Sequence, residues 1–168
     1  MTRFIVRDAT ADDARRIAAI ARASWIETYR DIFEPAFIED FLATHYGVSD
    51  LAAGAVRAAE ADDRHFLVAE IAGEVVAFAQ FGIGPRGPEL FRIYADPKHY
   101  GTGAGHALLE ELHRRLDGHV DGYVLDVHPR NERGLAFYRR QGFVVAGEGK
   151  SPDCHLMLRR ELRRPDGE

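Results

Sequence analysis

Three glycines at alternating positions form the chain's clearest chemical signal. Gly101, Gly103 and Gly105 follow a strand-like segment, Leu90–Ala95, and open a stretch in which apolar residues recur at helical spacing. The first N–H groups of a helix have no intrahelical acceptor, and the helix dipole adds partial positive charge beside them. Because glycine has no Cβ, a bulky polyphosphate can reach those groups. The pattern therefore predicts either a diphosphate-binding turn or simply a tight connection between strand and helix.

Two other phosphate-binding turns differ from this one. A dinucleotide-binding turn follows its strand almost directly, whereas the five residues Asp96–Tyr100 intervene here. A Walker loop ends in Gly-Lys-Ser or Gly-Lys-Thr, whereas this turn ends in Gly105-His106. A nucleotide-binding α/β domain therefore stays only a rival interpretation of the turn.

Length and composition limit the class of protein. The 168 residues are 46% hydrophobic and 29% charged, as in an ordinary globular protein, and we expect one domain over residues 1–162 with a disordered tail at 163–168. The net charge of −5 is unfavourable for general nucleic-acid binding, and no apolar run approaches a membrane span. Cys154 is the only cysteine, which excludes an internal disulfide and favours a cytoplasmic location.

The segment before the glycines combines helices with an antiparallel hairpin. A first strand is expected at Phe4–Asp8, and Thr10 with Asp13 has the pattern of a helix start. Pro35 should divide the following helical stretch in two. Aromatic residues recur there every four positions, at Trp25, Tyr29, Phe33, Phe37 and Phe41. The remaining elements are a third helix at Asp50–Ala61, paired strands at His65–Ile71 and Glu74–Ile83, and a loop at Gly84–Pro88.

The segment after the glycines completes a mixed sheet. The helix that they open ends near Leu116, with Gly118 at a left-handed cap. Strand, crossover helix and strand in succession predict that Tyr123–Val127 runs parallel to Leu90–Ala95. The last elements are a helix at Asn131–Gln141 and a hairpin of Phe143–Ala146 with His155–Leu158 around the loop Gly147–Asp153. The fold class is therefore α/β, with a mixed, mostly antiparallel sheet flanked by helices.

Two segments together resemble the signature of the GCN5-related N-acetyltransferases, the GNAT family. Tyr100–Gly105 matches the turn Q/R-x-x-G-x-G/A at both glycine positions, with Tyr100 where Gln or Arg is usual. Asn131–Phe143 is similar, in loose form, to the later pattern of Asn followed by Ala-x-x-x-Tyr-x-x-x-Gly-Phe. The resemblance covers roughly Ile5–Leu158, although only Leu90–Phe143 carries specific motifs. It implies the GNAT fold, in which the central pair of parallel strands splays apart.

The resemblance also implies acetyl-coenzyme A (acetyl-CoA) as the acyl donor. Its pantetheine arm would bond to strand groups left unpaired by the splay, at Ile93, Tyr94 and Ala95. Its diphosphate would be held by Gly101, Thr102, Gly103, Ala104, Gly105 and His106. Asn131 would bind near the thioester. One of Arg130, Arg133, Arg139 and Arg140 could meet the 3′-phosphate, although a solvated helix face is the simpler interpretation of all four.

Acetyl transfer to an amine needs an acid, a base and a donor to the carbonyl oxygen. The motif makes Tyr138 the acid that protonates the leaving thiolate, because a free tyrosine, with a pKa of about 10, stays protonated at neutral pH. The alternative is a tyrosine packed in the core. The amide of Ile93 or Tyr94 could stabilise the carbonyl oxygen. Glu89 and Asp126 are candidate bases, acting through water if not directly, and an enzyme without a dedicated base is the third option.

The sequence thus predicts an N-acetyltransferase that moves an acetyl group from acetyl-CoA to a primary amine by direct transfer in a ternary complex, without a metal. The alternative is an acyl-CoA-binding sensor without transfer activity, which would not need Tyr138. Trp25 and Tyr29 are candidates for the wall of the acceptor pocket, although core packing also explains the aromatic run. We expect a small-molecule or peptide amine as partner, neither nucleic acid nor membrane, and a homodimer is compatible with the resemblance.

Overall fold

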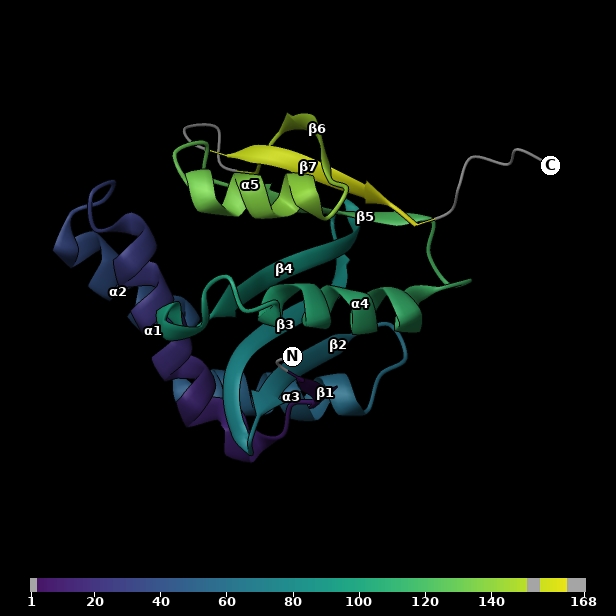
Figure 1. Ribbon diagram of the computed structural model, residues 1–168, viewed down its shortest axis with the longest axis horizontal. Helices are drawn as coiled ribbons and strands as arrows, with labels where there is room; N and C mark the ends of the chain where they lie inside the picture. Colours follow the sequence, from purple (N-terminus) through teal and green to yellow (C-terminus); the bar gives the residue numbers. More distant parts are fainter. Residues whose placement is uncertain (1–2, 151–154, 163–168) are drawn as a thin grey trace.

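The computed structural model describes residues 3–150 and 155–162, whose strands form one mixed sheet (Figure 1). The strands are β1 (Ile5–Asp8), β2 (His65–Ile71), β3 (Glu74–Gly84), β4 (Gly87–Ala95), β5 (Gly122–Val127), β6 (Val144–Glu148) and β7 (Leu156–Glu161). The helices are α1 (Ala14–Tyr29), α2 (Pro35–His45), α3 (Val48–Ala59), α4 (Ala104–Leu116) and α5 (Glu132–Arg140), with short 3-10 turns η1 (Ala11–Asp13) and η2 (Pro97–His99). The strand order is β1-β2-β3-β4-β5-β7-β6, in which the β4–β5 pair is parallel and the other pairs are antiparallel. This confirms the predicted fold class.

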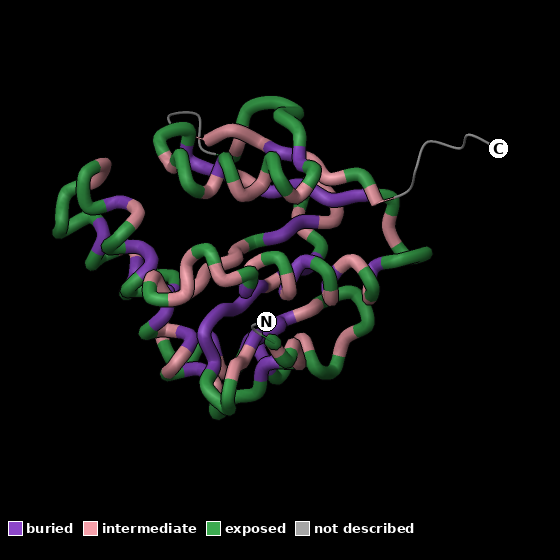
Figure 2. Tube along the Cα trace, viewed as in Figure 1, coloured by how far each residue is buried: buried purple, intermediate pink, exposed green. Residues whose placement is uncertain are grey.

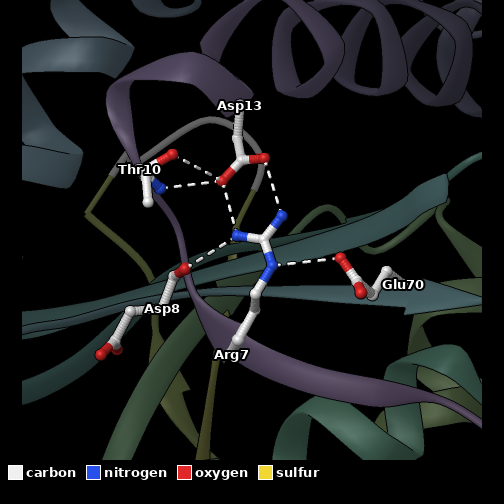
Figure 3. Close-up of polar contacts among 5 residues, drawn as sticks. All are labelled: Arg7, Asp8, Thr10, Asp13 and Glu70. Atoms are coloured by element: carbon white, nitrogen blue, oxygen red, sulfur yellow. Dashed lines mark hydrogen bonds and ion pairs between the residues drawn. The ribbon is translucent and has the colours of Figure 1, made fainter. Parts of the chain in front are cut away.

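The N-terminal strand is fixed to its neighbours by Arg7 (Figure 3). The guanidinium donates to both oxygens of Asp13, at 2.8 and 3.0 Å, and to Glu70 of β2 at 3.1 Å. Asp13 also accepts the N–H of Thr10 at 2.8 Å, as expected for the start of a helix. Hydrogen bonding to Arg7 lowers the pKa of Asp13. One arginine therefore joins β1, the beginning of α1 and the second strand of the sheet.

Alternating residues of β2 contribute side chains to two cores, one on each face of the sheet. Figure 2 shows that buried residues run along the central strands. Leu67 and Ala69 of β2 pack with residues of α4 and α5, whereas Phe66 and Val68 pack with residues of α1, α2 and α3. All four are essentially inaccessible to solvent. Strands covered on both faces form a rigid frame on which the loops and helix ends between β4 and β5 are held.

The parallel pair β4–β5 is joined only at its beginning, where Glu89 lies opposite Val124. Further along, β4 stays paired with β3 as far as Ala95, so within residues 3–150 and 155–162 Ile93–Ala95 has a strand partner along one edge only. The register between β3 and β4 shifts by one residue at Phe91, which forms a β-bulge. Bulges increase local twist, which turns the end of β4 away from β5. Figure 1 shows β5, β6, β7 and α5 grouped apart from β4 and α4.

Most of the predicted element boundaries hold within a few residues, and the exceptions have local causes. Pro35 is the first residue of α2, so proline divides the two helices as expected. The prediction of a loop over Gly84–Pro88 was wrong in extent: Gly84 pairs with Gly87, which leaves a two-residue turn, and β4 begins earlier. The last hairpin is displaced by one to three residues at its ends relative to the predicted Phe143–Ala146 and His155–Leu158.

Some expectations fall on parts of the chain outside the described residues. These are the tail at 163–168, Cys154, and the end of the predicted loop from residue 151 to Asp153. Within the described ranges, no helix has both the length and the apolar character needed to cross a bilayer.

Candidate active site

A cleft of about 370 Å³ opens where β4 and β5 part. Its walls are the end of β4, the end of β5, the glycine turn before α4, the inner face of α5 and part of α1. Of the predicted cofactor residues, nine line it: Ile93, Tyr94, Ala95, Gly101, Gly103, Ala104, Gly105, His106 and Asn131. Thr102 does not, because its hydroxyl turns back to donate to the carbonyl oxygen of His99 at 2.6 Å. The fold thus collects residues from two distant motifs around one cavity.

The glycine turn has the backbone shape that only glycine adopts easily. Gly101 and Gly103 have φ values of 75° and 95°, and Gly103 is the N-cap of α4. The first intrahelical bond runs from the Ala107 N–H to the Gly103 carbonyl, so the amides at the start of the helix point outward, toward the cleft. Gly105 has a different reason: a Cβ there would lie 2.9 Å from the Phe137 ring of α5. The turn therefore has the backbone geometry of an anion-binding site, and it also forms the surface that α5 contacts.

Tyr138 projects from α5 into the same cleft. Its ring contacts Phe137 and Phe143 edge-on, with centroids 5.4 and 5.5 Å apart. Burial raises the pKa of Tyr138 above its ordinary value, and its hydroxyl makes no hydrogen bond to any residue that the structure describes. A phenol that is protonated and not engaged by the protein can donate its proton to a reacting group.

Asn131 and Tyr29 lie next to each other at the inner end of the cleft. The Asn131 side chain accepts the Gly134 N–H at 2.9 Å and so caps α5. Burial raises the pKa of Tyr29 to about 12, although hydrogen bonding to Asn131 opposes the shift. Trp25, the other aromatic candidate, is 6% exposed, stacks on Phe41 at 4.1 Å and does not line the cleft.

The two candidate carboxylates are linked through Arg86 and Lys150, which the sequence analysis did not single out. Arg86 donates to Glu89 at 2.6 Å and to Asp126 at 2.8 Å. The Lys150 ammonium donates to Glu89 at 2.8 Å, and its backbone N–H donates to Asp126 at 2.9 Å. Asp126 lines the cleft, whereas Glu89 is 2% exposed and does not. No local pattern predicts these contacts, because the cations come from separate turns.

His128 is a buried polar residue that the sequence analysis assigned only to a turn. Its Nδ1 accepts the N–H of Arg130 at 3.0 Å, which assigns the ring proton of the neutral form to Nε2. Its ring meets Phe33 edge-on at 5.3 Å. Burial, with His155 and Arg130 nearby, lowers the pKa of His128. This histidine is therefore a neutral donor, and its one basic nitrogen is already occupied.

The fold and the two motifs match a known family. The model of the "Acetyltransferase (GNAT) family" matches residues 17–143. The chain belongs to this family. It is an acetyl-CoA-dependent N-acetyltransferase, and the recognition made from its glycine turn and later motif is confirmed.

Individual relatives agree with this assignment. The spermidine N(1)-acetyltransferase of Thermoplasma acidophilum is 29% identical over 143 residues, which are 83% of this chain and 88% of that protein. The 5-NmdU N-acetyltransferase of Pseudomonas phage PaMx11 is 39% identical over 88 residues, 48% of this chain and 58% of its own length. The crystal structure of the PaiA N-acetyltransferase from T. acidophilum in complex with coenzyme A has a TM-score of 0.86 to this chain, at 25% identity, and covers 95% of it and 99% of its own chain.

Proposed function

We propose that this N-acetyltransferase transfers the acetyl group of acetyl-CoA directly to the primary amine of a small acceptor, within a ternary complex. The observation that carries the proposal is that a strand edge that no described strand pairs with, a helix N-terminus and Tyr138 line one cleft. The thioester supplies an activated acyl group, and the protein has to hold it, admit a neutral amine and protonate the departing sulfur.

The two parts of the cleft suit the two chemically different parts of the donor. The edge of β4 at Ile93–Ala95 offers backbone N–H and C=O groups to the amides of a pantetheine arm, which would lie there as an additional strand. An N–H from the same edge could stabilise charge on the thioester oxygen. The outward amides of Gly103–His106 offer the N-terminal donors that a diphosphate requires. We propose these residues as the donor site.

Tyr138 is proposed as the acid that protonates the sulfur. The amine nitrogen forms a bond to the acetyl carbon, the carbon–sulfur bond breaks, and the tyrosine proton passes to the thiolate. Burial raises the pKa of Tyr138, which keeps that proton in place until the sulfur becomes basic. As the amide forms, the attacking nitrogen loses a second proton, which restores the tyrosine to its phenol form. The overall reaction of an ammonium acceptor yields the amide, the free thiol and one released proton.

Asp126 is proposed to receive the proton of the acceptor ammonium. It lines the cleft beside the end of β5, and each of its oxygens accepts one protein hydrogen bond, from Arg86 and from the Lys150 N–H. A carboxylate oxygen has a further lone pair for an incoming donor. Glu89 is buried away from the cleft and is proposed to fix Arg86 and Lys150 rather than to act as a base.

The acceptor is proposed to be a small primary amine, and polyamines are the first class to test. One relative, which matches 83% of the chain, is named for spermidine, and the phage relative is also named as an N-acetyltransferase. An acyl-CoA sensor would explain the strand edge and the glycine turn, but it would not require an unengaged tyrosine hydroxyl in the cleft.

Thiol release from acetyl-CoA tests the proposal. The protein is mixed with acetyl-CoA and one amine at a time, from polyamines, amino acids, short peptides and aromatic amines, and free thiol is followed with a chromogenic reagent. Mass spectrometry of the acceptor then identifies the amide. Release with at least one amine class, accompanied by its acetylated product, is the expected result. Tight binding of acetyl-CoA without thiol release for any amine would favour the sensor instead.

A further inference from the structure

Tyr100 and Arg133 both line the cleft and contact each other, and the proposed chemistry has so far used neither. Tyr100 begins the glycine turn, and Arg133 lies in the first turn of α5. The guanidinium carbon of Arg133 lies 4.2 Å from the centre of the Tyr100 ring. Both residues line the cleft together with Gly101 and Gly103. The pair, called the clasp below, thus joins the β4 side of the cleft to the β5 side.

A hydrogen bond to α1 fixes the Tyr100 ring. Its hydroxyl lies 2.9 Å from the hydroxyl of Ser24, which belongs to α1 and is only 3% exposed. A buried hydrogen-bond partner sets the orientation of the ring, so that one face is presented to Arg133. Tyr100, which stands where the motif usually has Gln or Arg, therefore presents a flat ring face, and its hydroxyl already has a hydrogen-bond partner.

Arg133 is held by this ring and by no acid among the residues that the structure describes. By contrast, Arg7 and Arg86 are each paired with two carboxylates. A guanidinium stacked on an aromatic face keeps all five N–H donors for another partner, and its planar fork fits phosphate oxygens in pairs. The Arg133 guanidinium is oriented, has no acidic partner among the described residues and lies near the outward amides of α4. Together these groups have the arrangement of an anion-binding site.

We propose that Arg133, oriented by the clasp with Tyr100, binds the diphosphate of coenzyme A from the side opposite the glycine turn. The inference rests on the proposed function, because it assumes that the donor's diphosphate lies on the amides of Gly103–His106. Two further contacts across the same gap keep α5 against the turn, namely Phe137 on Gly105 and a 3.0 Å hydrogen bond between His106 and Gln141. The cation therefore has a fixed position relative to those amides. Tyr100 is a positioning residue, and Arg133 is the binding residue.

Calorimetric titration with three ligands tests the assignment. Coenzyme A contains the diphosphate and the 3′-phosphate, 3′-dephospho-coenzyme A retains only the diphosphate, and pantetheine has neither. The expected result for Arg133→Ala is a Kd about 10- to 100-fold higher for both nucleotide ligands, as for the loss of a charge-assisted pair, and an unchanged Kd for pantetheine. Arg139→Ala is the matched control, because Arg139 is an exposed arginine on the same helix that does not line the cleft.

Tyr100 is tested by a double-mutant cycle. Tyr100→Leu should weaken binding of coenzyme A in the presence of Arg133 and have little further effect in Arg133→Ala, because the ring acts through the guanidinium. Arg133→Lys, which keeps the charge but lacks the planar fork, should fall between the unmodified protein and Arg133→Ala. Melting temperatures of the variants verify that each one is folded.

Three results would overturn the inference alone. The first is equal affinity of Arg133→Ala and Arg139→Ala for coenzyme A. The second is that the losses of affinity in Tyr100→Leu and Arg133→Ala add in the double-mutant cycle. The third is that Arg133→Ala loses affinity for coenzyme A but not for 3′-dephospho-coenzyme A. The last result would place Arg133 at the 3′-phosphate. Failure of the unmodified protein to bind coenzyme A would instead overturn the proposed function, and the inference with it.

Discussion

Tyr138 is the single residue on which the proposed chemistry depends most. Tyr138→Phe removes the proton and leaves the ring packed against Phe137 and Phe143. We expect kcat to fall by about 10²- to 10⁴-fold, the usual contribution of a positioned acid, with little change in the Kd for coenzyme A. Steady-state kinetics and calorimetry on the same preparation measure both quantities. An equal loss in rate and affinity would make the hydroxyl a binding group and not an acid.

The two carboxylates are expected to behave differently when neutralised. Asp126→Asn should lower kcat, because Asp126 lies at the cleft and an amide there cannot take up the proton of the acceptor. Glu89→Gln should chiefly lower the free energy of unfolding, by about 1–3 kcal/mol, because it removes the buried carboxylate that pairs with Lys150 and leaves Arg86 with Asp126 alone. Urea unfolding and steady-state kinetics of both variants separate these effects. An unchanged kcat in Asp126→Asn would remove this residue from the role of base.

At the scale of the secondary-structure element, the turn before α4 has to combine a left-handed backbone with open amides. Gly103→Ala adds the smallest possible side chain at φ 95° and should cost about 1 kcal/mol of stability. Gly118→Ala, at φ 77° beyond the other end of the same helix, should cost a similar amount and serves as the control. Only Gly103→Ala should weaken coenzyme A binding, since only Gly103 belongs to the turn that lines the cleft. Equal affinities in the two variants would contradict the backbone cradle.

The elements themselves could be predicted well because their signals are local. Two apolar runs joined by Ala72-Gly73 predicted β2 and β3, Pro35 predicted the break between α1 and α2, and the positive φ at Gly118 agrees with its predicted cap. The splay of β4 from β5 has no such signal, since it depends on a bulge at Phe91 that appears only when strands are paired. The splay was predicted instead from the resemblance to the GNAT family.

The site was predictable only as far as its motifs extended. The three glycines of the turn, Asn131 and Tyr138 were found because each one has a fixed place in a sequence pattern, and all five line the cleft. Arg86, Lys150, His128 and the Tyr100–Arg133 contact were not found, because each depends on two segments meeting in space. The side chains that distinguish one enzyme from others with the same fold are of this kind, because their contacts join segments that are distant in the sequence.

At the scale of the whole molecule, we expect a half-buried histidine to make stability depend on pH. Burial lowers the pKa of His113 to about 4 from its ordinary value of about 6.5, and its Nε2 lies 2.8 Å from the Tyr123 hydroxyl. Between pH values of about 6.5 and 4, His113 binds a proton in the unfolded chain but not in the folded chain. The free energy of unfolding therefore falls as pH falls through that window. Because His113 is partly exposed, we expect its share of the fall to be about 1–2 kcal/mol.

Urea unfolding at several pH values between 4 and 7 measures this share as a difference between proteins. His113→Gln should flatten the slope of unfolding free energy against pH, whereas His119→Gln, at an exposed position just beyond α4, should leave it as in the unmodified protein. Parallel slopes for all three proteins would show that His113 titrates alike in both states.

The most direct test of the whole account is the melting temperature of the protein with and without saturating acetyl-CoA, with NAD as the control ligand. A ligand that binds only the folded state at about 100 times its Kd adds about 2.7 kcal/mol. For a chain of this size, that corresponds to a rise of about 5–10 °C. We expect this rise with acetyl-CoA and none with NAD. No rise with acetyl-CoA, or an equal rise with NAD, would contradict the assignment of the cleft to an acetyl-CoA donor.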